Sequence, residues 1–177
     1  MLSILTMLTA FGSSVTTAFA ADGTLRFNSG ETIAYGDYYT TRMTFDGENT
    51  AYCLEPLKKT PAAGEYEYNL LPQDSPIRKA LYYLNGGYGY ETITRDQCFH
   101  GWSDTDAYVI GHLTVAYIYD NYNDAGGTFY GAPQNFIDKT KEVVGVINSL
   151  PEPPKSFRAF ILPAADHQTV AGSWYEK

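Results

Sequence analysis

The sequence is poor in cysteine and in basic residues. Its 177 residues include two cysteines and three histidines, and 12 lysines and arginines stand against 20 aspartates and glutamates, for a formal net charge of −8. Nucleic-acid binding needs clustered lysine and arginine, and so does attraction to an anionic membrane. We therefore expect no nucleic-acid partner and no membrane insertion of the mature domain.

Charge is missing altogether from the first 20 residues. This stretch is mostly apolar and ends in Ala18-Phe19-Ala20, which puts small residues where a signal peptidase cleaves. Its Thr, Ser and Gly content does not suit a membrane-spanning helix, although the basic segment that usually opens a signal peptide is lacking. We predict a signal peptide over residues 1–20 and one domain over residues 21–177, secreted and displayed at the cell surface or cell wall.

Tyrosine, by contrast, is abundant, with 16 copies. Tyrosine provides a large contact area at low entropic cost on binding surfaces, and it also packs in cores with its hydroxyl reaching water. We expect both uses in this chain.

The order of local patterns predicts an α+β domain. Strand patterns cover residues 24–27, 38–45 and 50–54, with a turn at 28–30, a hairpin turn at Asp46-Gly47 and a proline-containing loop after Pro56. Helix patterns follow at residues 75–84, 103–122 and 134–150, and two further strands at 156–162 and 169–175. We therefore expect a β-rich, sandwich- or barrel-like part with an inserted helical part.

The two cysteines, Cys53 and Cys98, carry the chemistry of interest. In an exported chain with an even number of cysteines, a disulfide between them is the ordinary expectation. Alternatively, the Cys53 thiol attacks a nearby glutamine amide, expels ammonia and leaves an internal thioester that waits for an amine on a target protein. Such a bond survives where apolar neighbours, here Tyr52 and Leu54, keep water out.

Several segments together resemble the thioester domains of Gram-positive surface adhesins. They are Ala51-Tyr52-Cys53-Leu54-Glu55-Pro56, the helix from Ile77 to Gly86 with Leu81-Tyr82-Tyr83, and the closing segment Gln168 to Tyr175. The resemblance extends over residues 24–175. It implies an adhesion domain with stalk domains after it, which needs no cofactor, is not an enzyme, and binds a host or extracellular-matrix protein.

One position departs from the family pattern. The second helix of the family carries Thr-Gln-x-Ala, and Gly111-His112 aligns with its Thr-Gln. Histidine has no acyl carbon, so Cys53 and His112 cannot form a thioester. We therefore predict non-covalent binding, with Cys53 either free or disulfide-bonded.

Two alternatives stay open. Cys53 could form a thioester with another glutamine, for which Gln97 and Gln134 are the candidates. It could also act as the nucleophile of a cysteine hydrolase or transferase, with His112 as base and Asp106 orienting it. Against the second alternative, a buried histidine on an apolar helix is more often a satisfied core residue.

The sequence predicts no metal site. His100 and His167 have no cysteine or carboxylate at the spacing that zinc ligands require. The segment from Asp120 to Asp124 imitates part of a calcium loop but lacks the distal glutamate.

Overall fold

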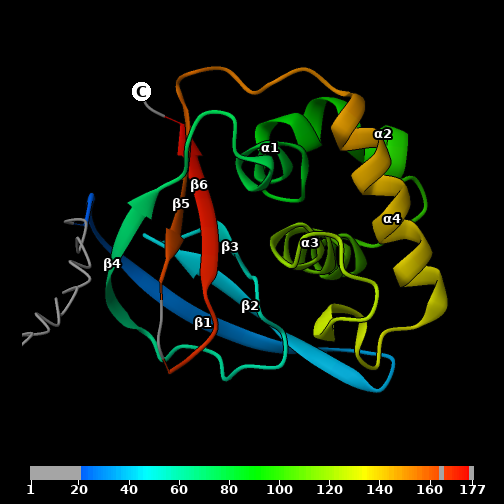
Figure 1. The fold of residues 1–177 in the computed structure, drawn as a ribbon, viewed down its shortest axis with the longest axis horizontal. Coiled ribbons are helices and arrows are strands. Elements are labelled where there is room, and N and C mark those ends of the chain that lie inside the picture. Colours follow the sequence, from blue (N-terminus) through cyan, green and yellow to red (C-terminus); the bar gives the residue numbers. More distant parts are fainter. Residues whose placement is uncertain (1–20, 164–165, 176–177) are drawn as a thin grey trace, which may run out of the picture.

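Two parts make up the molecule, a six-stranded β-barrel and a group of helices packed on one side of it (Figure 1). This computed structural model describes residues 21–163 and 166–175. The expected signal peptide lies outside the described residues.

The barrel is antiparallel throughout and closed, with the strand order β1-β2-β3-β6-β5-β4. Its strands are β1 (Gly23–Tyr35), β2 (Tyr38–Phe45), β3 (Asn49–Cys53), β4 (Gly64–Leu70), β5 (Phe157–Leu162) and β6 (Val170–Tyr175). Closure leaves no sheet edge exposed along most of the barrel. Asp46 and Gly47, both at positive φ, form the predicted hairpin turn between β2 and β3.

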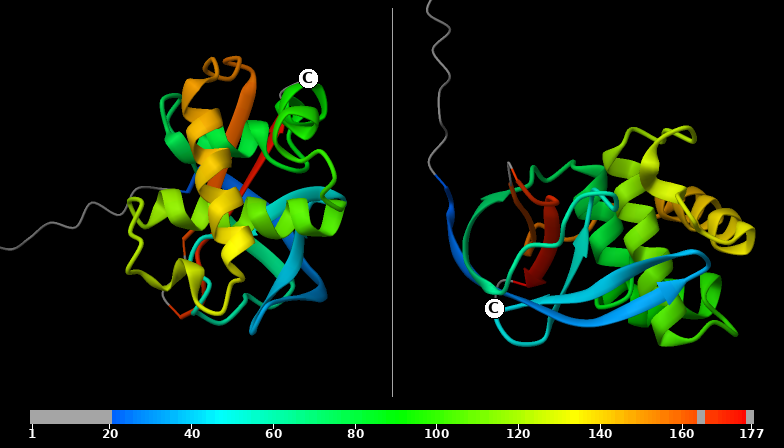
Figure 2. Two further views of the ribbon diagram at one scale, coloured as in Figure 1. Left: turned by 90° about the vertical axis from the view of Figure 1, so that its right-hand side faces the viewer. Right: turned by 90° about the horizontal axis from the view of Figure 1, so that it is seen from below.

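All helices of the described residues are inserted between β4 and β5. They are α1 (Pro76–Tyr83), a π-helical turn (Tyr90–Thr94), α2 (Arg95–Cys98), α3 (Asp104–Tyr119), a 3₁₀ turn (Gly127–Phe129) and α4 (Gln134–Ser149). Helix α3 lies between the strands and α4 (Figures 1 and 2). The α+β class, with a barrel and an inserted helical part, is thereby confirmed.

Helix α3 is the central helix of the molecule. Ser103 caps its N-terminus by accepting a hydrogen bond from the backbone of Asp106, and Asp104 adds a favourable charge to the first turn. All residues from 107 to 118 are buried, as predicted for a helix that is apolar nearly all round. The helix can therefore carry side chains directly to the barrel wall.

Three local expectations are wrong. The predicted turn at residues 28–30 is part of β1, which continues through a register shift between Ser29 and Thr32. The expected loop after Pro56 contains β4, whose tyrosines alternate with acidic residues in the period of a strand. Cys98, which lies outside all the predicted helices and strands, ends the short helix α2.

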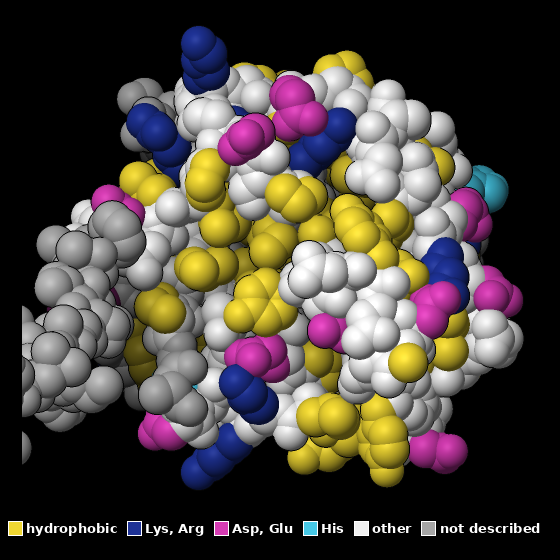
Figure 3. Space-filling view, in the orientation of Figure 1, with side chains coloured by type: hydrophobic (Ala, Val, Ile, Leu, Met, Phe, Trp, Pro, Cys, Tyr) yellow, Lys and Arg dark blue, Asp and Glu magenta, His cyan; other side chains and the backbone are white. Residues whose placement is uncertain are grey.

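The surface carries no basic stripe on the face that Figure 3 presents, where acidic, basic and uncharged side chains are interspersed. Across residues 21–163 and 166–175, no helix combines the length and apolar character needed to cross a bilayer.

Candidate functional site

The site begins where two barrel strands separate. The pairing of β2 with β3 ends at Met43 and Ala51, and beyond that pair the strands diverge. Tyr108 of α3 reaches this point: its hydroxyl accepts a hydrogen bond from the Met43 backbone (3.0 Å) and donates to the Ala51 carbonyl (2.9 Å). Helix α3 thus takes the place of a strand partner where the barrel wall opens.

His112 lies one helical turn after Tyr108 and faces the same opening. Its Nδ1 atom is 3.2 Å from Sγ of Cys53, the last residue of β3, and its Nε2 atom is 3.8 Å away. The preceding residue is Gly111, where a Cβ atom would come within 2.8 Å of the Tyr52 hydroxyl. Glycine at this position therefore lets α3 approach β3 closely enough for the thiol–imidazole contact.

Both members of the pair are uncharged near neutral pH. Cys53 and His112 are each only 1% exposed. Burial raises the pKa of the Cys53 thiol well above its usual range and lowers the pKa of the His112 imidazole to about 4. The resting pair is therefore a thiol beside a neutral imidazole, not a thiolate with an imidazolium.

Gln168, which was not predicted from the sequence as a site residue, also belongs to this site. Cys53 pairs with Val170 across β3 and β6, and the Leu54 backbone continues the ladder to the carbonyl of Thr169. Gln168 comes next along the chain, two residues before β6 begins, and it is buried.

Hydrogen bonds fix the Gln168 amide. Its Nε2 donates to the carbonyl of Lys58 (2.9 Å) and to the hydroxyl of Thr60 (3.1 Å), and its backbone donates to the carbonyl of Lys59 (2.9 Å). Within the described part of the chain, its Oε1 is buried and has no hydrogen-bond partner. Leaving a buried amide oxygen unpaired is costly.

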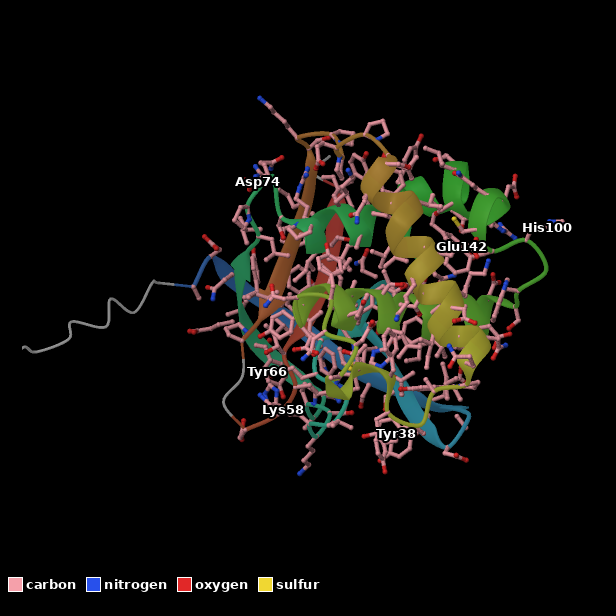
Figure 4. The ribbon with its side chains drawn as sticks, turned by 45° about the vertical axis from the view of Figure 1, so that its right-hand side comes forward. Tyr38, Lys58, Tyr66, Asp74, His100 and Glu142 are labelled. Atoms are coloured by element: carbon pink, nitrogen blue, oxygen red, sulfur yellow. The ribbon has the colours of Figure 1, made fainter. Side chains whose placement is uncertain are left out.

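One cavity of about 300 Å³ joins these groups. Its lining consists of Tyr38, Tyr39, Thr40, Thr41, Cys53, Pro56, Lys58, Lys59, Thr60, His112 and Gln168. Figure 4 shows two of them, Tyr38 and Lys58, at the same end of the molecule, far from Asp74 and His100. Cys53, His112 and Gln168 therefore line a common cavity.

The other residues considered from the sequence lie elsewhere. Gln97 and Gln134 are exposed, and Gln134 bonds to Asp138. Asp106 accepts a hydrogen bond from Ser103 at the start of α3, so it does not orient His112. Cys98 is buried but belongs to a different apolar cluster from Cys53, and both thiols are free.

Asp124, in the acidic segment after α3, serves the packing of that helix. Asp124 accepts hydrogen bonds from the Tyr117 hydroxyl and from the Lys141 ammonium group, at 2.8 and 2.7 Å. Its carboxylate thus links the end of α3 to α4. Among the described residues, no three His, Cys, Asp or Glu side chains gather as metal ligands would.

The fold is shared with N-terminal domains of bacterial surface proteins. The pilus tip adhesin Cpa of Streptococcus pyogenes matches with a TM-score of 0.55 at 14% identity, over 86% of this chain and 94% of that one. The thioester domain of a Clostridium perfringens surface protein matches with a TM-score of 0.57 at 12% identity, over 87% and 100%. That of Enterococcus faecium TIE86 matches with a TM-score of 0.51 at 9% identity, over 86% and 77%.

The family itself is identified by sequence. The sequence model of the family described as "Thioester domain" matches residues 24–154. The chain belongs to the thioester-domain family, as its motifs indicated. No curated protein matches the sequence.

Proposed function

We propose that this domain is a covalent adhesion module of a secreted, cell-wall-attached protein, and that its reactive bond is a thioester between Cys53 and Gln168. The observation that carries the proposal is the cavity that Cys53, His112 and Gln168 line together, with the thiol and the imidazole in contact. Gln168 supplies the acyl carbon that His112 lacks. The proposal therefore replaces the non-covalent binding expected from the sequence with the alternative that uses another glutamine.

Formation of the bond uses all three side chains. Nδ1 of His112 accepts the thiol proton while Sγ of Cys53 bonds to Cδ of Gln168. The bond from Cδ to Nε2 then breaks, and the nitrogen leaves as ammonia with the proton that the imidazole returns. A neutral imidazole is the form that can accept a proton, and burial keeps His112 in that form.

Ligand capture opens the thioester again. It does not regenerate the side-chain amide of Gln168. A nucleophile on the ligand bonds to Cδ of residue 168, the bond from Cδ to Sγ breaks, and the nucleophile's proton ends on Cys53. The ligand, for which we propose a host or extracellular-matrix protein, is then attached to residue 168. Because the Gln168 amide is consumed, the domain acts once and does not turn over.

A second candidate function follows from the 3.2 Å contact between Cys53 and His112, which a cysteine hydrolase or transferase would also need. One feature disfavours it: among the described residues, no carboxylate contacts His112 to orient it as the base of a triad.

The test is the intact mass of the secreted chain and of four variants. The thioester lowers the mass by about 17 Da through loss of ammonia, because thiol addition to the amide expels that group. We expect this deficit in the natural protein and its complete loss in Cys53→Ala and Gln168→Ala. The matched controls Gln97→Ala and Gln134→Ala keep it, since both side chains are exposed and outside the cavity.

Two results would contradict the proposal. A natural protein at full mass with a free Cys53 thiol would return the domain to non-covalent binding. Hydrolysis of model esters that both Cys53→Ala and His112→Ala abolish, with Gln168→Ala unaffected, would instead favour the hydrolase.

A further inference from the structure

The lining of the cavity is positively charged in a molecule that is negatively charged overall. It includes Lys58 and Lys59, both exposed, and no aspartate or glutamate among the described residues. Lys58 is paired with Glu55 at 2.6 Å, a residue outside the lining. A cationic ligand that approaches the cavity therefore meets like charge, most directly at Lys59.

Three aromatic rings cluster beside the lysines. The rings of Tyr38 and Tyr39 stack with centroids 5.3 Å apart, and Tyr130 packs edge-on against Tyr38. Tyr39 and Tyr130 are 59% and 62% exposed. The Tyr38 hydroxyl donates to the Pro56 carbonyl at 3.0 Å, which holds this ring in place. The three rings, which we call the tyrosine platform (Tyr38, Tyr39 and Tyr130), present exposed aromatic surface at Tyr39 and Tyr130.

Such a platform suits a sugar ring. The C–H groups on one face of a pyranose carry a slight positive charge and pack against the negative face of an aromatic ring. Its hydroxyl groups then point outward, toward the neighbouring cavity. Two of the three tyrosines, Tyr38 and Tyr39, also line the cavity that contains Cys53, so one ligand can touch both.

The chemistry of the cavity also favours a hydroxyl over an amine. A lysine amine has a pKa near 10.4 and arrives as a cation, which the lysines repel. A hydroxyl arrives uncharged but must lose its proton as it attacks, and so requires a base within reach. His112 provides that base beside the thioester sulfur, at 3.2 Å in the free-thiol form.

We propose that the nucleophile captured at this site is a hydroxyl group of a carbohydrate, and that the product is an ester at residue 168. This inference rests on the proposed Cys53–Gln168 thioester. The hydroxyl oxygen bonds to Cδ of residue 168 while its proton passes to an imidazole nitrogen of His112. The bond from Cδ to Sγ breaks, and His112 delivers the proton to Sγ, which restores the Cys53 thiol and the neutral imidazole.

The first experiment measures adducts on the secreted chain by intact mass at pH 7, with equal concentrations of glycerol, maltotriose and methylamine. We expect the glycerol adduct to exceed the methylamine adduct about tenfold, and maltotriose to react faster than glycerol because the platform binds it. Hydroxylamine removes an ester but leaves an amide, so it should release the glycerol and maltotriose adducts only.

Two variants assign the effect to the proposed surfaces. Lys59→Glu should raise methylamine addition relative to glycerol, whereas Lys155→Glu, on the exposed loop before β5, should not. Tyr39→Ala should abolish the preference for maltotriose over glycerol. Its control, Tyr88→Ala, removes a ring that is equally exposed at 60% but lies outside the cavity.

The outcomes separate the two proposals. A natural protein without the mass deficit of about 17 Da refutes the thioester, and the hydroxyl proposal falls with it. A protein that shows the deficit but adds methylamine as readily as glycerol keeps the thioester and overturns the hydroxyl proposal. Glycerol addition without a maltotriose preference overturns the assignment of a carbohydrate as the ligand. The captured nucleophile is then a hydroxyl group on a protein.

Discussion

At the scale of single residues, the molecule keeps His112 uncharged inside a protein core. The imidazole has the Cys53 thiol as its hydrogen-bond partner and the ring of Tyr35 as an edge-on neighbour, with centroids 6.3 Å apart. Its folded pKa of about 4 lies below the ordinary value of 6.5. The unfolded chain therefore binds a proton at higher pH than the folded chain, and acid favours unfolding.

This pKa difference predicts a loss of stability between pH 6.5 and pH 4. Above pH 6.5 neither state protonates His112, and the free energy of unfolding is unaffected; below it, only the unfolded state gains the proton. The full effect at pH 4 is about 3 kcal/mol. In a Gln168→Ala background, which removes the thioester, His112→Gln should show a correspondingly shallower fall in urea unfolding between these pH values.

His100→Gln in the same background is the control, because His100 is exposed. The protonation of carboxylates contributes equally to all three proteins, so only the difference between them is informative. Identical pH profiles for the His112→Gln variant and its parent would contradict the assignment of a depressed pKa to this histidine.

At the scale of elements, the contact between α3 and the open barrel wall depends on one hydroxyl. Tyr108 bonds to both Met43 and Ala51 at the last pair of the β2–β3 ladder, and its ring stacks on Tyr52 at 5.0 Å. A phenylalanine would keep the ring but leave a buried N–H and a buried carbonyl unpaired.

Tyr108→Phe should therefore lower the free energy of unfolding by about 1–3 kcal/mol, the usual cost of orphaned buried polar groups. Urea unfolding measures it, and Tyr119→Phe, on the same helix but 40% exposed, should change stability by less than about 0.5 kcal/mol. Equal stability of the two variants would show that the Tyr108 hydroxyl does not support the opening.

Elements with a strong local pattern could be predicted from the sequence, and the site could be predicted only in part. Helix α3 and the Asp46-Gly47 turn follow from periodicity and turn chemistry. The opening between β2 and β3 has no local signature, because it arises from how far two strands stay paired. Gln168 lies in the segment that resembles the closing strand of the family. The family pattern instead pointed to the second helix for the acyl donor, at the position of His112.

At the scale of the whole molecule, the thioester would connect strands that are far apart in sequence. Positions 53 and 168 enclose the helical insertion and two strands, β4 and β5. A cross-link that closes a loop of about 115 residues restricts the unfolded chain and stabilises the folded one by about 4–5 kcal/mol in the chain-entropy treatment.

Opening the thioester should therefore lower the melting temperature. Thermal unfolding of the secreted chain before and after methylamine treatment measures the change, and Cys53→Ala, treated in the same way, should show none. Unchanged melting of the natural protein, once mass has confirmed that the bond opened, would contradict a stabilising cross-link.

The position of Gln168 also bears on mechanics. It lies two residues before β6, the last strand of the described chain, which runs from Val170 to Tyr175. When a ligand is bonded to residue 168 and Cys53 is released, tension between the ligand and the carboxyl end of the chain follows the covalent backbone along β6 alone. The rest of the barrel and the helices stand outside the load path, so the attachment does not depend on whether they stay folded.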